Sequence, residues 1–267
     1  MPQRVCIAGA GGRMGRMLLE AVGAEPALTL AGALEHPQSL LNGKDTAELV
    51  GAGKGVVISS DVNAALSQCD VLIDFTRPEG TLHHLAACRK HGVKAIIGTT
   101  GFSAEQKREI TAAARDIAVV FAPNMSIGVN VSLKLIELAA RTLGESYDIE
   151  IIEAHHKLKV DAPSGTALMM GEVAAAVRGK NLDDIGVFER HGVIGERRPG
   201  SIGFSAIRGG DIIGEHTVLF AGAGERIEIS HKSASRANYA QGAIRAALFL
   251  AGKKTGLYDM QDVLGLK

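Results

Sequence analysis

Short apolar runs alternate with helical segments along the first half of the chain. Six strands are predicted there, at residues 4–8, 29–34, 56–58, 71–75, 93–97 and 117–122. In the helix that follows the first strand, Met14, Leu18 and Val22 recur on one face. Strands that alternate with helices are typical of an α/β domain built on a parallel sheet.

The pattern changes near residue 126. An apolar helix is predicted over residues 126–143, and a strand over residues 147–154. Three strands joined by short turns are then expected to form a meander, at residues 201–208, 215–221 and 225–232. An alanine-rich helix at residues 235–252 is expected to return to the first domain. The second part is therefore predicted to be an α+β domain with a mixed open sheet.

A glycine-rich turn joins the first strand to the first helix. Gly9, Gly12 and Gly15 differ in spacing from the commonest dinucleotide-binding pattern, but the strand before them and the helix after them are the expected context. Glu35 follows the second strand, where an acidic side chain would bind the ribose hydroxyls of adenosine. His36 comes next and, when protonated, could meet a 2′-phosphate. We therefore predict a Rossmann-like dinucleotide-binding domain; the alternatives are a tight turn without a ligand and a solvated loop around Glu35.

Three further loops are expected to line the same crevice, because ligands bind at the carboxyl ends of the strands in an open parallel sheet. These loops follow later strands, at residues 76–81, 98–101 and 123–126. Each loop alone is equally typical of an ordinary surface connection.

Residues 153–168 concentrate the candidate chemistry of the second part. If the chain stays extended beyond its strand, His155, Lys157 and Lys159 share one face while His156 points the other way. Histidine suits proton transfer near neutral pH, and neighbouring lysines attract an anionic substrate. The stretch therefore predicts a general acid with cationic helpers; the alternative is a strand end with solvated basic residues.

A helix start lies in the same stretch. Ser164 is a good N-cap for a helix begun by Thr166, since Pro163 prevents the strand from continuing. The amides of Gly165 and Thr166, with the positive end of the helix dipole, form a natural carboxylate or phosphate site. No metal is predicted, because adjacent histidines on a strand point apart and no cysteine lies nearby at ligand spacing.

Composition changes this picture little. Of the 267 residues, 46% are hydrophobic and 22% charged, which is ordinary for a soluble globular protein. The 29 basic and 29 acidic residues cancel, so bulk charge favours neither nucleic acid nor an anionic membrane as a partner, and any anion site has to be local. Cys6, Cys69 and Cys88 are expected to be reduced thiols. The lack of an apolar leader and of a long apolar run indicates a soluble, cytoplasmic protein.

On these motifs the chain resembles the 4-hydroxy-tetrahydrodipicolinate reductase family, also called dihydrodipicolinate reductase, of the bacterial diaminopimelate and lysine pathway. The resemblance covers nearly the whole chain. It rests on residues 5–15, 74–76, 98–101 and, most specifically, 153–168.

The resemblance implies a reaction, a fold and an assembly. The reaction is the NADH- or NADPH-dependent reduction of (2S,4S)-4-hydroxy-2,3,4,5-tetrahydrodipicolinate to tetrahydrodipicolinate, with hydride transfer to ring C4 and loss of water. Residues 1–126 and 236–267 are expected to form the dinucleotide-binding domain, and residues 127–235 the domain that binds substrate and mediates tetramerisation. The protein is then expected to be a homotetramer whose second domains associate through their sheets.

The resemblance also assigns site residues. His155 is implied as the general acid and Lys159 as a second proton donor. The small dicarboxylate substrate is implied to be held by His156, Ser164, Gly165 and Thr166. The implied cofactor-binding residues are Gly9, Ala10, Gly11, Gly12, Arg13, Met14, Glu35, His36, Gly98, Thr99, Thr100, Ala122, Pro123, Asn124 and Met125.

This chain departs from the family pattern at two of these positions. Many members carry arginine where this chain has His36, so the choice between NADH and NADPH stays open. Met125 stands where an aromatic residue is frequent. The alternatives to the reductase are a nucleotide-sensing binding module on the same fold, a dehydrogenase of another small dicarboxylate or semialdehyde and, more remotely, a metal-dependent hydrolase.

Overall fold

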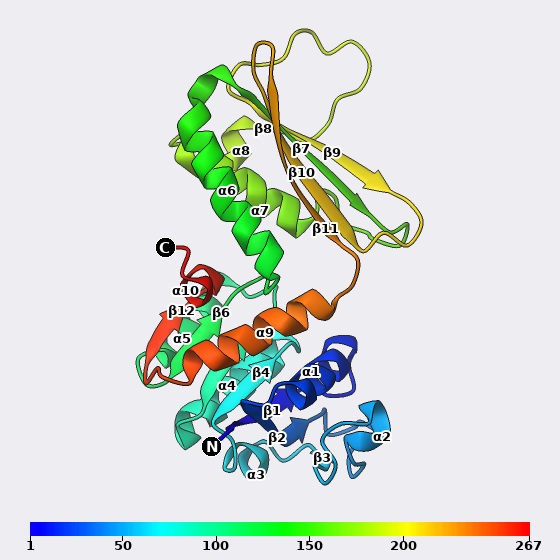
Figure 1. Cartoon of the computed structure of the whole chain (residues 1–267), viewed down its shortest axis with the longest axis vertical. Helices are drawn as coiled ribbons and strands as arrows, with labels where there is room; N and C mark the ends of the chain where they lie inside the picture. The colour runs from blue at the N-terminus through cyan, green and yellow to red at the C-terminus, as the bar shows by residue number, and fades with distance from the viewer. The chain divides into compact units, whose positions relative to one another are not determined.

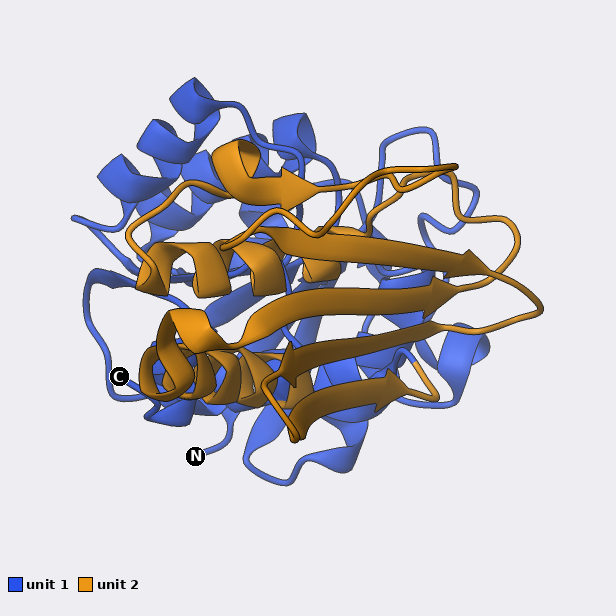
Figure 2. Cartoon of the chain, turned by 90° about the horizontal axis from the view of Figure 1, so that it is seen from above, with its two compact units in different colours: residues 1–127, 236–267 blue, residues 128–235 orange.

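The computed structural model describes all residues from 1 to 267. The chain folds into two units, each with its own hydrophobic core. Unit 1 contains residues 1–127 and 236–267, and unit 2 contains residues 128–235 (Figure 2). The chain therefore passes between the units twice.

Unit 1 is built on a seven-stranded parallel sheet with the strand order β12-β6-β5-β4-β1-β2-β3 (Figure 1). Its strands are β1 (Gln3–Ala8), β2 (Leu28–Leu34), β3 (Ile58–Ser59), β4 (Val71–Asp74), β5 (Lys94–Ile97), β6 (Ala118–Phe121) and β12 (Gly256–Tyr258). The order reverses between β1 and β4. In open α/β sheets, ligands bind outside the carboxyl ends of the strands at such a point.

Helices cover both faces of this sheet. One face is packed by α1 (Arg13–Ala24), α9 (Ala237–Leu250) and α10 (Met260–Leu264). The other face is packed by α3 (Val62–Leu66), α4 (Pro78–His91) and α5 (Ala104–Ala113), while α2 (Ala47–Val50) lies in the connection from β2 to β3. Successive residues Cys6 and Ile7 of β1 are both fully buried, in different clusters, because both faces are covered. This explains why the predicted strands are continuous apolar runs.

Unit 2 is built on a five-stranded mixed sheet with the order β11-β10-β7-β9-β8. Its strands are β7 (Asp148–His155), β8 (Gly186–Val187), β9 (Ile202–Arg208), β10 (Gly214–Ala221) and β11 (Arg226–Ser233). Its helices are α6 (Ile127–Leu143), α7 (Gly165–Val177) and α8 (Leu182–Ile185), with a single 3-10 turn at Gly144–Ser146. The core lies between the sheet and α6, α7 and α8.

The predicted meander of the last three strands is wrong. β9 pairs in parallel with β7 and β10 pairs antiparallel with β7, so β7 lies between them and only β10 and β11 form a hairpin. The central position suits β7, because Ile149 and Ile151 are fully buried in the core. Alternation of apolar and polar residues is the same in a hairpin strand and in a crossover strand, so it indicates a buried face but not a neighbour.

Most other predicted elements agree with the structure. The helix and strand expected around residue 145 are confirmed by α6 and β7, within one residue at each end. The strand expected at residues 56–58 is shifted to Ile58–Ser59, and Val57 instead forms an antiparallel bridge with Asp45. The short elements β12 and α10 were not predicted, since three and five residues carry too little periodicity to identify.

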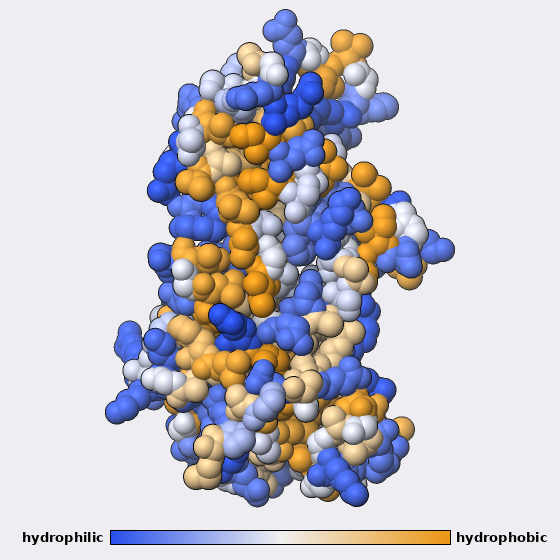
Figure 3. Space-filling view, viewed as in Figure 1, coloured by the Kyte–Doolittle hydropathy of each residue, from blue (hydrophilic) through white to orange (hydrophobic).

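One face of α6 is apolar and exposed. Ile127, Val131, Leu135 and Leu138 follow one another at helical spacing, and each is between 37% and 61% exposed. Hydrophobic residues accordingly gather over this helix in Figure 3. No helix of the chain combines the length and the apolar character needed to cross a membrane.

Candidate functional site

The turn between β1 and α1 is shaped for close approach of an anion. Gly9 has φ of +71°, and a Cβ at Gly15 would lie 2.0 Å from the Gly9 carbonyl oxygen, so both positions require glycine. Gly12 caps α1 with extended backbone and no side-chain hydrogen bond. The N-terminus of α1 is therefore open to a negatively charged group.

Glu35 follows β2, as predicted, and lies beside this turn. Its Oε1 accepts a hydrogen bond from the Gly11 amide at 2.8 Å, and its Oε2 accepts one from the His36 amide at 3.0 Å. A Cβ at Gly11 would lie 3.0 Å from Glu35 Oε1 and 2.2 Å from the side chain of Leu41. An acidic side chain next to an open helix N-terminus fits the ribose and pyrophosphate of a dinucleotide. The imidazole of His36 is exposed and accepts from the Gln38 amide at 3.3 Å.

Asp74, at the carboxyl end of β4, is a buried hub that the sequence analysis did not assign to the site. Its Oδ1 accepts from the amide and hydroxyl of Thr76, at 2.9 and 2.6 Å, and from the Thr81 hydroxyl at 3.1 Å. Its Oδ2 accepts from His84 Nδ1 at 2.7 Å. The Thr81 hydroxyl in turn lies 2.9 Å from the Thr99 hydroxyl. A polar network thus joins α4 to the loops after β4 and β5.

The loops after β1, β4 and β5 meet at one edge of the sheet. The Gly98 amide donates to the Asp74 carbonyl at 2.9 Å, and a Cβ at Gly98 would lie 2.3 Å from the Phe75 ring. A Cβ at Gly9 would lie 3.1 Å from the Thr76 methyl group. The expectation that these loops lie together is therefore correct for Gly9 and Gly98.

The predicted cofactor-binding residues differ in their exposure to solvent. Arg13, Thr100 and Pro123 are exposed, and Gly9, Gly11, Gly12, Met14, Glu35, His36 and Gly98 are at least partly so. Ala10, Thr99, Ala122, Asn124 and Met125 are buried. Met125 packs its side chain into the core of unit 1, and a Cβ at Gly242 of α9 would lie 1.7 Å from its carbonyl oxygen. The Met125 side chain therefore contributes to core packing.

In unit 2, the chemistry centres on the carboxylate of Glu153, which is 1% exposed on β7. Oε2 accepts from His155 Nδ1 at 2.7 Å and from Arg208 Nη1 at 2.7 Å. Oε1 accepts from Arg208 Nη2 at 2.6 Å and from the Ser164 amide at 3.1 Å. Burial would raise the pKa of Glu153, but the hydrogen bonds from Arg208 and His155 outweigh it and hold this pKa below its ordinary value.

These contacts fix the His155 ring. Because the carboxylate can only accept, Nδ1 carries a hydrogen and Nε2 is left for other chemistry. A Cβ at Gly214 of β10 would lie 3.1 Å from His155 Nε2, so glycine gives this ring its room. His155 is therefore held in one orientation by Glu153, as a general acid requires.

The chain does not stay extended beyond His155, so the predicted common face of His155, Lys157 and Lys159 is wrong. β7 ends at His155, and the Lys159 amide donates to the His156 carbonyl at 3.1 Å, which closes a turn. Lys157 is exposed. Lys159 Nζ donates to both carboxylate oxygens of Asp161, each at 2.8 Å, and this lowers the pKa of Asp161. His156 is half-buried, with Nδ1 enclosed and without a hydrogen-bond partner.

Ser164 is the N-cap of α7, as predicted, but the helix begins one residue earlier, at Gly165. The Ser164 hydroxyl oxygen accepts from the Ala167 amide at 3.2 Å and lies 2.8 Å from His216 Nε2. Gly165 is exposed, and a Cβ there would meet nothing within 4 Å, while Thr166 is half-buried. The predicted anion site therefore has an open approach at Gly165.

Sequence reasoning missed Arg208 and His216. Arg208 is 55 residues from Glu153 along the chain but is paired with His155 across the β7–β9 ladder. His216 lies opposite Glu153 on β10, and its ring is 5.1 Å from that of His155 between centroids, edge to face. The only sequence signal for His216 was its place in the alternating pattern of β10. It is the one polar residue on the same face as the buried residues Val218 and Phe220.

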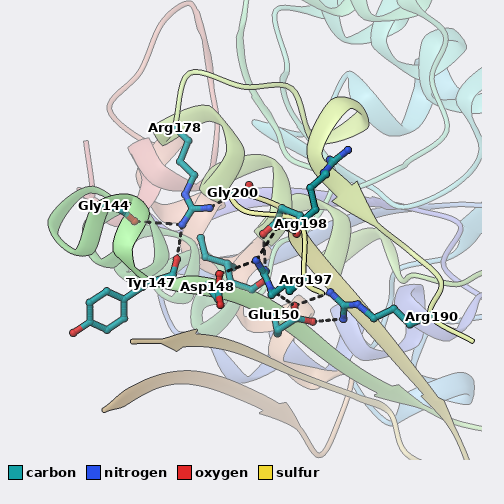
Figure 4. Close-up of polar contacts among 11 residues, drawn as sticks. Gly144, Tyr147, Asp148, Glu150, Arg178, Arg190, Arg197, Arg198 and Gly200 are labelled. Atoms are coloured by element: carbon teal, nitrogen blue, oxygen red, sulfur yellow. Dashed lines mark hydrogen bonds and ion pairs between the residues drawn. The ribbon is translucent and has the colours of Figure 1, made fainter. Parts of the chain in front are cut away.

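A second group of charges ties the loop before β9 to the beginning of β7 (Figure 4). Arg190 forms two hydrogen bonds with Glu150, at 2.7 and 2.8 Å. Arg197 donates to Asp148 at 2.8 Å and to Glu150 at 3.1 Å, and Arg178 donates to the Tyr147 carbonyl at 2.7 Å. Arg190 and Arg197 pair with acidic residues at the opposite end of β7 from His155, and Arg178 bonds to a backbone carbonyl beside them, so we assign all three to the structure of unit 2 and not to the site. The chain has no group of three or more histidine, cysteine, aspartate or glutamate side chains suited to hold a metal ion.

Two family models match the chain almost end to end. The model described as dihydrodipicolinate reductase, N-terminus, matches residues 3–125, and the model described as dihydrodipicolinate reductase, C-terminus, matches residues 128–264. The chain belongs to the dihydrodipicolinate reductase family.

Relatives within this family are similar over their whole length. The 4-hydroxy-tetrahydrodipicolinate reductase of Burkholderia mallei (strain SAVP1) is 62% identical over 264 residues, which cover 99% of this chain and 98% of that protein. The enzyme of the same name from Burkholderia pseudomallei (strain 668) is also 62% identical over 264 residues, with 99% and 100% covered.

Solved structures agree with the fold. The dipicolinate-bound dihydrodipicolinate reductase from Paenisporosarcina sp. TG-14 has a TM-score of 0.80 and 27% identity, and covers 98% of this chain and 99% of that one. GenD2 from gentamicin A biosynthesis, in complex with NAD, has a TM-score of 0.62 and 13% identity, with 99% and 91% covered, and shows likeness of fold alone. The predicted Rossmann-like domain with a second, mixed-sheet domain is confirmed by these comparisons and by the two sheets.

Removing the Asp74 carboxylate should destabilise unit 1 strongly. Asp74→Ala leaves His84 and the hydroxyls of Thr76 and Thr81 without their acceptor, and loss of a buried charged partner costs about 3–5 kcal/mol. Asp116→Ala is the matched control, because it removes an exposed carboxylate that pairs with Arg89 and should cost about 1 kcal/mol or less. Urea unfolding of both variants measures the difference. Equal losses would show that the Asp74 network does not stabilise the unit.

The buried imidazole of His216 should make stability depend on pH. Burial, with the charge of His155, lowers the pKa of His216 to about 4 in the folded protein, against 6.5 for an unperturbed histidine; Glu153 opposes this shift, and His231 and Lys159 add to it. Below about pH 6.5 the unfolded chain therefore binds a proton that the folded protein refuses. The free energy of unfolding should fall by about 2 kcal/mol from pH 7 to pH 5 through this group alone.

The measurement is urea unfolding of the wild type and of His216→Gln at both pH values. The variant cannot titrate at this position, so its loss between pH 7 and pH 5 should be smaller by that amount. An identical loss in both proteins would mean that His216 does not titrate as its burial predicts.

Proposed function

We propose that this protein catalyses the NADH- or NADPH-dependent reduction of (2S,4S)-4-hydroxy-2,3,4,5-tetrahydrodipicolinate to tetrahydrodipicolinate with loss of water, in the diaminopimelate and lysine pathway. The observation that carries the proposal is 62% identity, over 99% of the chain, to enzymes named for this activity. The dipicolinate bound by the Paenisporosarcina relative supports a small ring dicarboxylate as the ligand class.

Unit 1 supplies the cofactor site in this proposal. The residues that fit the dinucleotide are the turn from Gly9 to Met14, with its open helix N-terminus, and Glu35, beside it. Gly98, Thr99 and Thr100, with residues 122–125, complete the proposed binding wall. Hydride for ring C4 of the substrate comes from the reduced nicotinamide when the cofactor is bound. The side chain of Met125 is buried in the core, so its contribution to the wall is through its backbone.

Unit 2 supplies the proton and the anion site. His155 is the proposed general acid, and Glu153 is its orienting partner, because the carboxylate accepts the hydrogen bond from Nδ1 and leaves Nε2 to give up the proton. Lys159 is the proposed second donor; its ammonium group pairs with Asp161 within the same turn. Ser164, Gly165 and Thr166 at the start of α7, with His156, are proposed to hold the two carboxylates of the substrate.

We assign residues 1–126 and 236–267 to dinucleotide binding and residues 127–235 to substrate binding and tetramerisation. Support for a homotetramer comes from the outer face of the sheet of unit 2, where Ile152 and Ile207 are 37% and 51% exposed. Such apolar residues on the free face of a sheet are typical of a face that packs against another copy.

The first experiment is the initial rate of nicotinamide oxidation with freshly generated 4-hydroxy-tetrahydrodipicolinate, run in parallel with NADH and NADPH. We expect rapid oxidation of at least one of them. His36→Arg should shift the ratio of the two rates toward NADPH, because a guanidinium binds a 2′-phosphate better than an exposed imidazole does. Binding of both cofactors without consumption of either would refute the reductase and favour the sensing module.

Replacement of the general acid should affect turnover and leave cofactor binding intact. His155→Gln should lower kcat by about a hundredfold or more, the usual contribution of a general acid. Glu153→Gln should also lower kcat, since it removes the carboxylate that holds the His155 ring in its orientation. His191→Gln, the same change at an exposed histidine of unit 2, is the control and should retain the wild-type rate. Near-normal turnover of His155→Gln would remove this residue from the role.

A further inference from the structure

A buried histidine with no part in the reaction proposed above lies directly behind Ser164. His216 is on β10 and is 4% exposed. Its Nε2 lies 2.8 Å from the Ser164 hydroxyl oxygen, and its Nδ1 is enclosed without any hydrogen-bond partner. Nε2 is therefore hydrogen-bonded to Ser164, whereas Nδ1 has no hydrogen-bond partner.

This asymmetry decides which nitrogen carries the hydrogen. A neutral imidazole has one N–H and one bare nitrogen. A hydrogen on Nδ1 would be a buried donor with no acceptor, which proteins rarely tolerate. The hydrogen therefore lies on Nε2, and His216 donates to the Ser164 hydroxyl oxygen.

The second donor to Ser164 completes the argument. Its hydroxyl oxygen also accepts from the Ala167 amide at 3.2 Å, as the N-cap of α7. A hydroxyl oxygen has two lone pairs, and His216 and Ala167 use both. The Ser164 hydroxyl can then act only as a donor, and its hydrogen has to point away from both of them.

We propose that His216 is a positioning residue for the substrate: it fixes the Ser164 hydroxyl as a hydrogen-bond donor toward a substrate carboxylate at the start of α7. The inference rests on the proposed function, in which Ser164 binds a carboxylate. A carboxylate accepts hydrogen bonds only, so a hydroxyl that turned a lone pair toward it would repel it. With His216 in place, the hydroxyl does not have to be reoriented when the anion binds.

The same arrangement connects anion binding to the acid. The Ser164 amide donates to Glu153 Oε1, and His155 Nδ1 donates to Oε2 of the same carboxylate. The His216 ring packs edge to face against His155. Ser164 and His155 are thus held by one carboxylate. His216 therefore orients a hydroxyl whose position relative to the proposed proton donor is already fixed.

Three replacements of His216 test this inference. His216→Leu removes the donor. His216→Gln places an amide N–H close to the position of Nε2, and His216→Asn is the matched control because its shorter amide reaches only the position of Nδ1. The probe is dipicolinate itself, with its dissociation constant measured by calorimetry, alongside KM and kcat for the substrate and the dissociation constant of NADH.

We expect His216→Leu and His216→Asn to weaken dipicolinate binding about tenfold and to raise KM by a similar factor, which is the loss of about one well-placed hydrogen bond. The kcat should change less than threefold, and NADH binding should not change. His216→Gln should bind dipicolinate within threefold of the wild type. In a Ser164→Ala background, His216→Leu should have no further effect on binding, because its effect acts through the hydroxyl.

Two results would overturn the inference. One is equal dipicolinate affinity in the wild type and the Leu and Asn variants; the other is full additivity of His216→Leu with Ser164→Ala. If His216→Leu does not fold, the comparison of Gln with Asn decides alone. Absence of turnover in a wild type that binds dipicolinate would defeat the proposed reaction, and the binding series would still decide the role of His216.

Discussion

The buried carboxylate of Glu153 is the constraint on which unit 2 depends. A charge that is 1% exposed is tolerable only when it is fully paired, and this one accepts from His155, from the Ser164 amide and twice from Arg208. Its partners come from β7, from the start of α7 and from β9. The two carboxylate oxygens therefore fix the positions of β7, β9 and the start of α7 relative to one another.

Unit 1 also contains a buried carboxylate that has to be paired, that of Asp74. This carboxylate is also 1% exposed, and it is also paired with one histidine, His84, but its other close partners are the Thr76 amide and the hydroxyls of Thr76 and Thr81. These other donors are neutral, so only His84 can bring a charge to this carboxylate, and the donors come from α4 and from the loop after β4. In both units a buried carboxylate lies at or near the carboxyl end of a central strand and orders the loops that carry the proposed binding residues.

The sequence predicted those parts of the fold that depend on local pattern. Five strands of unit 1 (β1, β2, β4, β5 and β6), the helix over residues 126–143, the cap at Ser164 and the position of Glu35 each follow from periodicity, turn residues or a spacing within one βαβ unit. The wrong meander and the wrong common face of Lys157 and Lys159 have one cause. Both required knowledge of what lies beside a segment, and neither alternation nor charge along the chain reports that.

Partners far apart in sequence were missed for the same reason. Arg208 and Glu153 are 55 residues apart, and His216 and Ser164 are 52 apart. Arg208 meets Glu153 because the β7–β9 ladder brings β9 beside it, and His216 meets Ser164 because the β7–β10 ladder places it opposite Glu153, whose carboxylate accepts from the Ser164 amide. A lone inward histidine in an apolar strand such as β10 was a signal that a polar partner had to exist, since a buried imidazole is costly without one.

The neutral net charge of the chain is consistent with the way in which it provides anion sites. In the proposed function, helix N-termini bind the anions in place of a basic surface, and the two caps differ in a way that suits the two proposed ligands. At α1 the cap is Gly12, without a side chain, which leaves room for the pyrophosphate of a dinucleotide to reach the backbone. At α7 the cap is Ser164, whose hydroxyl satisfies one helix amide and remains a donor because His216 fills its other lone pair. The carboxylates of a small dicarboxylate are separate charges, and each is bound best by a donor that points at it. At α7, a serine oriented by a buried histidine therefore suits the proposed substrate better than a glycine would.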